Sequence, residues 1–193
     1  LVGVSQGVAL DYSILGVRNE SRDQYSYIGS AGAVSIALPA DTAINTAGTG
    51  AHGILAQSIG GGGGVVTSYQ YGQTPKLVGT SFSGSPDSLG NAGAVTVSTN
   101  GQISVSGAGA YGVVAQSIGG SGGLFTSDGN VSLGQDPAGS SWGSSGGVTV
   151  NVLGSITASG ENGIGVLAQS RGAGKIEVNV GGASPGTVSG GSG

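Results

Sequence analysis

Residues 53–61 read Gly-Ile-Leu-Ala-Gln-Ser-Ile-Gly-Gly, and almost the same stretch returns at residues 112–120 and 165–172. Counted between the glutamines at positions 57, 116 and 169, the copies lie 59 and 53 residues apart. A long period in a glycine-rich chain is typical of repeat folds, in which each unit stacks on its neighbours to bury its apolar face. The repeated triplets are Ala56-Gln57-Ser58, Ala115-Gln116-Ser117 and Ala168-Gln169-Ser170.

The composition narrows the class of protein. Of the 193 residues, 44 are glycine and only 7% are charged. Low charge and ample Val, Ile and Leu argue against disorder, and the lack of a Gly-X-Y period excludes collagen. With 5 Lys plus Arg and a net charge of -4, no basic patch can neutralise several phosphates, so we expect no nucleic-acid binding. Cysteine is absent, which excludes disulfides, thiolate metal sites and cysteine catalysis.

Each triplet is preceded by two other β-branched segments, separated by Gly, Ser and Asn. The repeats cover about residues 30–64, 91–123 and 146–175. No helical period is present, and glycine is too dense for helices. The sequence therefore predicts an all-β fold, a parallel β-helix whose successive turns are about 4.8 Å apart. Residues 1–29 match the repeats poorly, and we expect them to be an end coil or the tail of a different unit.

Alternation along the repeated strand predicts where its side chains point. Ala56 and Ser58 share one face, and Gln57 and Ile59 share the other. The position of Ile59 becomes Arg171 in the third copy, and an arginine is not expected inside a narrow apolar lumen. We therefore predict that the alanines point inward and the three glutamines outward. The alternative is buried glutamines whose amides bond to the backbone of turns.

Two insertions follow the first two triplets, at residues 65–90 and 124–145, whereas the third copy has almost nothing there. Insertions at one repeat position map to one side of a solenoid, which is often the binding side. The aromatic and acidic residues of the insertions are the candidates for binding a partner. The alternative is that the aromatic side chains fold back and cover the strands. The candidates are Tyr69, Tyr71, Phe82, Asp128, Asp136 and Trp142.

The repeats resemble a known family. Gly-x-Ile-x-Val-x-Gly at residues 101–107, followed by Gly-Val-Val-Ala-Gln-Ser-Ile-Gly-Gly-Ser-Gly-Gly at residues 112–123, resembles the glycine-rich repeats of bacterial autotransporter passengers. The resemblance covers about half of the chain and departs at residues 171–174. It implies a surface-exposed or secreted right-handed β-helix, exported through a C-terminal outer-membrane barrel that this sequence does not contain. The chain shows no signal peptide or long apolar run, and we interpret it as a piece of a larger polypeptide.

Enzyme motifs match only by chance. Residues 48–53 and 107–112 read Gly-x-Gly-x-x-Gly, but a dinucleotide site needs a following helix. Gly-x-Ser-x-Gly occurs five times without the strand-to-helix turn of a nucleophile elbow. The one histidine, His52, is replaced by Tyr111 and Ile164 in the other repeats. This favours a rim residue over a catalyst, although a unique residue in a repeat can mark a site.

We therefore expect a structural and adhesive module of the bacterial cell surface that is not an enzyme, with no cofactor, catalytic residue or metal ligand. Its expected partner is a glycan or protein of a host or neighbouring cell, or a second copy of itself. One rival is a glycan-cleaving enzyme that uses Asp128 and Asp136, with Trp142 as a sugar platform. Two further hypotheses are a filament subunit that stacks end to end and a passive spacer.

Overall fold

The computed structural model describes most of the repeats and part of the insertions. Every regular element in the described residues is a β-strand, which confirms the all-β prediction. Side chains are described in residues 30–60, 90–120, 143–182 and 185–193. The backbone is described in those ranges and in residues 2–6, 63–67, 122–127 and 130–133.

Three stretches of the chain each contribute three strands in the same order, and we call each such set a rung. The first rung consists of β2 (Val34–Leu38), β3 (Ala43–Thr46) and β4 (Ile54–Ile59). The second consists of β6 (Val95–Thr99), β7 (Gln102–Val105) and β8 (Tyr111–Ile118). The third consists of β11 (Val148–Val152), β12 (Ser155–Ala158) and β13 (Ile164–Arg171).

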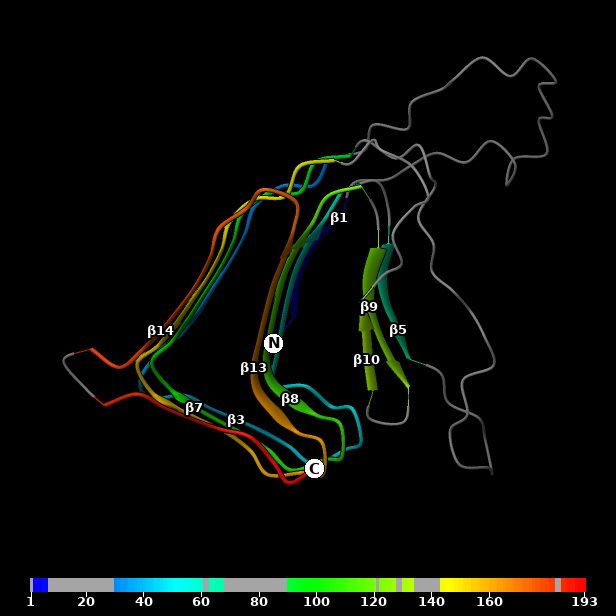
Figure 1. Cartoon of the computed structure of the whole chain (residues 1–193). Helices are drawn as coiled ribbons and strands as arrows, with labels where there is room; N and C mark the ends of the chain where they lie inside the picture. Colours follow the sequence, from blue (N-terminus) through cyan, green and yellow to red (C-terminus); the bar gives the residue numbers. More distant parts are fainter. Residues whose placement is uncertain are drawn as a thin grey trace, which may run out of the picture.

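Equivalent strands of successive rungs pair in parallel and form three four-stranded sheets. Their orders are β1-β4-β8-β13, β14-β11-β6-β2 and β15-β12-β7-β3, so the three rungs lie next to one another in each sheet. The register aligns the repeats residue by residue, with Gln57 opposite Gln116 and Gln116 opposite Gln169. In Figure 1 the three sheets form the sides of a triangle. This arrangement is compatible with the predicted β-helix.

The triangle encloses an apolar core because every second side chain of each strand points into it. In β6 the burial alternates, and Val95 and Val97 are 0% exposed. One continuous cluster joins them to Ile103 of β7 and Val113 of β8, and it extends into the neighbouring rungs. Each fully buried aliphatic side chain stabilises such a core by about 1.5–3 kcal/mol. The core is therefore shared among the rungs.

The turn between the second and third strands has the same conformation in each rung. In each, an N–H donates to a carbonyl three residues earlier, from Ala51 to Gly48 in the first rung at 2.9 Å. The residue inside this turn has a positive φ: 66° at Gly50, 62° at Gly109 and 54° at Asn162. Glycine adopts this conformation without strain and asparagine tolerates it. The third repeat therefore keeps the turn without a glycine at the position of positive φ.

The sheets extend beyond the three repeats recognised in the sequence. The strand β1 (Val2–Gln6) pairs with β4, so the stretch that matches the repeats poorly still supplies a strand. A fourth, partial rung follows the third repeat, with β14 (Ile176–Val180) paired to β11 and β15 (Thr187–Ser189) paired to β12. Sequence reasoning missed this rung, although Val178 and Val180 continue the alternation of the earlier repeats.

The insertions contribute a further, smaller sheet. It has the order β10-β9-β5, made of β5 (Gly63–Thr67), β9 (Gly122–Ser127) and β10 (Asn130–Leu133). The pair β5 and β9 is parallel, whereas β9 and β10 are antiparallel. Figure 1 shows this sheet beside the β4–β8–β13 sheet, on the side away from the triangle's interior.

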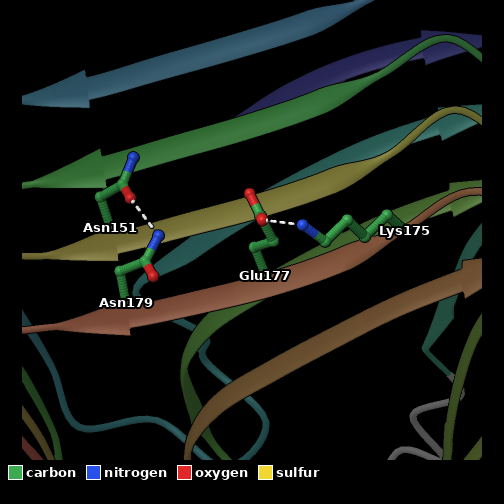
Figure 2. A network of polar contacts seen from close by, with 4 residues as sticks. All are labelled: Asn151, Lys175, Glu177 and Asn179. Atoms are coloured by element: carbon green, nitrogen blue, oxygen red, sulfur yellow. Dashed lines mark hydrogen bonds and ion pairs between the residues drawn. The ribbon is translucent and has the colours of Figure 1, made fainter.

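The outer face of the β2–β6–β11–β14 sheet is polar. Asn179 donates its side-chain N–H to Oδ1 of Asn151 at 3.0 Å, and Asn151 donates to Oγ of Ser98 at 3.4 Å. Figure 2 shows the Asn151–Asn179 contact between β11 and β14, next to the ion pair of Lys175 with Glu177. Such exposed ion pairs contribute little to stability, so this face is held together mainly by its backbone ladder.

Candidate functional site

The alanine of each Ala-Gln-Ser triplet faces the apolar core. Ala56 and Ala115 are 0% exposed and belong to the main cluster, and Ala168 packs against it. Strands of the other two sheets supply valine and isoleucine side chains to the same cluster, so these side chains fill the space around the alanines. A small side chain fits here, and larger side chains would need the neighbouring strands to move.

The glutamines form a ladder that runs across the rungs. Gln57 donates its amide N–H to Oε1 of Gln116 at 2.6 Å, and Gln116 donates to Oε1 of Gln169 at 2.9 Å. Both donors are 0% exposed. Repeated amide ladders of this kind stabilise stacked parallel strands. At the first-rung end of the ladder, Oε1 of Gln57 is buried without a partner among the described residues, because Val4 occupies the position opposite it in β1.

The glutamines point away from the core but are not exposed. Leu55 and Val114, which alternate with the alanines, belong to a separate apolar cluster. The face that carries these residues, Gln57 and Gln116 is buried, and Figure 1 places the β5–β9–β10 sheet beside it. A second layer of strands accounts for this burial. The predicted directions are therefore confirmed, with the alanines facing the core and the glutamines facing away from it. The alternative is wrong about the partners, because the amides of the buried glutamines bond to one another rather than to the backbone of turns.

The serine of each triplet connects two successive rungs at a corner. Ser117 donates its hydroxyl to the carbonyl of Gly93 at 2.9 Å and accepts the N–H of Gly146 at 2.9 Å. Ser58 makes the same pair of bonds to Gly32 and Gly93, both at 2.8 Å. Each hydroxyl thus satisfies two backbone groups that the strand ladder does not reach.

Those corners also require glycine for space. A Cβ built on Gly93 would lie 2.5 Å from the backbone nitrogen of Ala33, and one on Gly146 would lie 2.4 Å from that of Ala94. Backbone atoms of the preceding rung cannot move aside without breaking the ladder. The recurring glycine before each first strand is therefore explained by the close approach of two corners.

The third rung departs from this scheme, as its sequence does. Gln169, Leu167 and Arg171 are half-buried, whereas their equivalents in the second rung are fully buried. At the corner, Ser170 still donates its hydroxyl to the carbonyl of Gly146 at 3.2 Å, but the N–H of Gly174 donates to Oγ of Ser145 at 3.3 Å instead of to Ser170. The two Oγ atoms lie 2.7 Å apart. The third repeat has almost no insertion of its own, so its outer face is less covered.

A histidine and a tyrosine are stacked at one corner between the first two rungs. Their ring centroids are 4.9 Å apart, with 12° between the ring planes. The backbone N–H of Tyr111 donates to Nδ1 of His52 at 3.0 Å, while Nε2 of His52 is buried without a partner in the described residues. Burial lowers the pKa of His52 and raises the pKa of Tyr111. The sequence identified His52 as unique in the repeat but not its bond to Tyr111.

The binding candidates of the insertions lie outside the described residues, so they remain predictions. These are Tyr69, Tyr71, Phe82, Asp128, Asp136 and Trp142. Within the described part of the chain, no cluster of three or more His, Asp or Glu side chains could hold a metal ion. The same residues contain no helix with the length and apolar character needed to cross a membrane.

Comparisons with known proteins give no further guide to the site. No protein-family model, curated protein or solved structure matches the chain.

Proposed function

We propose that the chain is a segment of a right-handed parallel β-helix that serves as a structural and adhesive module of the bacterial surface. The stacked rungs are the rigid part, and the two insertions are the binding part. The resemblance of the repeats to autotransporter passengers supports the location and the handedness. The partner we propose is a glycan or protein on a host or neighbouring cell.

One observation carries this proposal: the two insertions leave the rungs at the same corner and start side by side. Each follows its Ala-Gln-Ser strand directly, and their first strands β5 and β9 pair in parallel from Gly63 opposite Gly122 onward. The longer remaining segments, residues 68–89 and 134–142, start from β5 and β10, the two outer strands of this same sheet. Two loops anchored on one rigid sheet present a shared binding surface at a lower ordering cost than two loops without a common base.

The experiment removes the loops and keeps the covering sheet. Residues 68–89 and 134–142 are replaced by short Gly-Ser linkers, so that β5, β9 and β10 stay and the glutamine face is not uncovered. The purified chain is tested against a glycan array and immobilised matrix proteins. We expect binding to be lost while the β-type circular dichroism is unchanged.

A matched control changes the outer face of a different sheet. Thr157→Lys introduces a charge on an exposed position of β12 and should leave binding intact. If the double replacement binds as well as the original chain, the proposal is wrong. If Thr157→Lys also abolishes binding, the sheet face rather than the insertions is the binding surface.

A second candidate, self-association by stacking of rungs, is favoured by a different observation. The core-facing side chains Ile176, Val178 and Val180 of β14 are 45%, 45% and 50% exposed, and β14 is the outermost strand of its sheet. Exposed strand edges with apolar side chains are sites of pairing with another chain. Sedimentation of the 193-residue chain should show association that Val178→Lys abolishes. Thr157→Lys, at an exposed position of the inner strand β12, should not abolish it. A monomer at all concentrations contradicts the candidate.

A further inference from the structure

The corner that contains His52 and Tyr111 is held differently from the equivalent corner one rung further on. Between the second and third rungs, strand pairing begins at Tyr111 opposite Ile164. Between the first and second rungs, the paired positions begin later, at Ile54 opposite Val113, and one backbone bond precedes them, from the N–H of Gly53 to the carbonyl of Tyr111 at 2.9 Å. Before these paired positions, the N–H of Tyr111 donates to the imidazole of His52 rather than to a carbonyl. A side chain therefore replaces a backbone acceptor at the beginning of the β4–β8 pair.

This geometry specifies the protonation state of His52. Because Nδ1 accepts the N–H of Tyr111, the ring proton of the neutral imidazole is on Nε2. Protonation would place a second proton on Nδ1, directed at the N–H of Tyr111. Two donors would then face each other at 3.0 Å, and the charge would be buried with no acceptor for Nε2–H among the described residues.

No charged group described in the structure compensates for a positive charge at this place. Tyr111 is the ionisable residue that contacts the ring, and desolvation is the cause of the lowered pKa of His52. The strands β1, β3 and β4, and the inserted strands β5, β9 and β10, contain no ionisable residue. Glu161 belongs to the equivalent turn of the third rung and is exposed.

We propose that the His52–Tyr111 corner is a pH-sensitive contact: protonation of the imidazole breaks the bond from the Tyr111 N–H and separates His52 from the start of β8. The corner between the second and third rungs, which has Ile164 in the place of the acceptor, stays closed. The opening is limited to His52, because the bond from the Gly53 N–H to the Tyr111 carbonyl, the glutamine ladder and the Ser58 bonds hold β4 in place. This inference does not depend on the proposed function.

The direction of the effect follows from the lowered pKa of His52. The folded chain binds the proton more weakly than the unfolded chain, so the contact is fully stable above the unfolded pKa of about 6.5. Its contribution is lost as the pH falls below that value towards the folded pKa. Mild acid therefore opens the corner, and neutral pH closes it.

Two nuclear magnetic resonance measurements test the proposal. The first is the tautomer of the single histidine at neutral pH, which should carry its proton on Nε2. The second is the hydrogen-exchange protection of the Tyr111 amide, corrected for intrinsic exchange, between about pH 7.5 and about pH 4.5. The reference is the amide of Gly109, which bonds to the carbonyl of Glu161 at the neighbouring corner.

We expect the protection of Tyr111 to fall at least about tenfold relative to Gly109 over that range. In His52→Asn, whose side-chain oxygen replaces Nδ1 without titrating, the protection should not depend on pH. In His52→Phe, which keeps the ring stack and has no acceptor, it should be low throughout. A proton on Nδ1 at neutral pH, or the same pH dependence in His52→Asn as in the original chain, would overturn the proposal.

Discussion

The strands β11 and β14 have the same pattern and the same register, yet they differ in burial. Val148, Val150 and Val152 of β11 are 0% exposed, whereas the residues opposite them in β14 are 45–50% exposed. The difference lies in what surrounds them, because β11 has a rung on either side and β14 is the outermost strand of its sheet. Burial in this molecule thus comes from neighbouring rungs more than from the strand's own sequence, as in other repeat folds.

Among the substitutions considered, those in the glutamine ladder should show the largest difference in lost free energy of unfolding between an interior rung and an outer rung. Gln116→Ala leaves the donor of Gln57 and the acceptor of Gln169 without partners in a buried place, and also creates a cavity. We expect a loss of about 4 kcal/mol in the free energy of unfolding. Gln169→Ala, at a half-buried position with one ladder bond, should cost about 1 kcal/mol. Urea denaturation measures both, and equal losses would contradict the ladder's role.

The core valines provide the next comparison. Val150→Ala removes two methyl groups from a site without solvent, and we expect it to cost about 2 kcal/mol. Val178→Ala, at the paired position of β14, should cost less than about 1 kcal/mol because the side chain is already half in water. The thermal unfolding midpoints of the two variants show which substitution destabilises the chain more. A larger loss at position 178 would show that the fourth rung is covered in solution.

Replacing the serine at the corner should lower the free energy of unfolding by a smaller amount. Ser117→Ala removes the hydroxyl that serves the carbonyl of Gly93 and the N–H of Gly146, and should cost about 1–2 kcal/mol. Its control is Ser189→Ala, an exposed serine whose one bond is long, 3.5 Å to the carbonyl of Ile156. That change should be close to neutral. Amide exchange of Gly146 identifies the bond that is lost, because its protection should fall only in Ser117→Ala.

Acidification should have the smallest effect on global stability. The lowered pKa of His52 means that the unfolded chain takes up a proton first, so stability decreases as the pH falls below about 6.5. Urea denaturation measures the free energy of unfolding of the original chain and of His52→Asn at each pH. Subtracting one from the other removes the contributions of the carboxylates, which both chains share. Identical pH profiles would show that His52 is not buried in the folded chain.

The sequence predicts the all-β class because β-branched residues alternate and glycine is too frequent for helices. It does not predict the fourth rung, since that rung lacks an Ala-Gln-Ser triplet and only the alternation around Val178 remains. It also does not predict the burial of Gln57 and Gln116, because the covering strands come from insertions whose pairing cannot be read from the repeat. The bond from Tyr111 to His52 was missed for a related reason: it joins a side chain to the backbone of the next rung.

The central claim is that residues one repeat apart lie directly beside each other in parallel strands. The chain has no cysteine, so a pair introduced at Ser98 and Asn151, which are aligned in β6 and β11 and whose side chains are in contact, tests this register without interference. We predict that the oxidised Ser98→Cys/Asn151→Cys chain forms an intramolecular disulfide, since neighbouring strands are within the Cα distance of about 4.4–6.8 Å that a disulfide needs. Ser98→Cys/Asn179→Cys, separated by one further strand, should not form one. Cross-linking of the second pair but not the first would contradict the account.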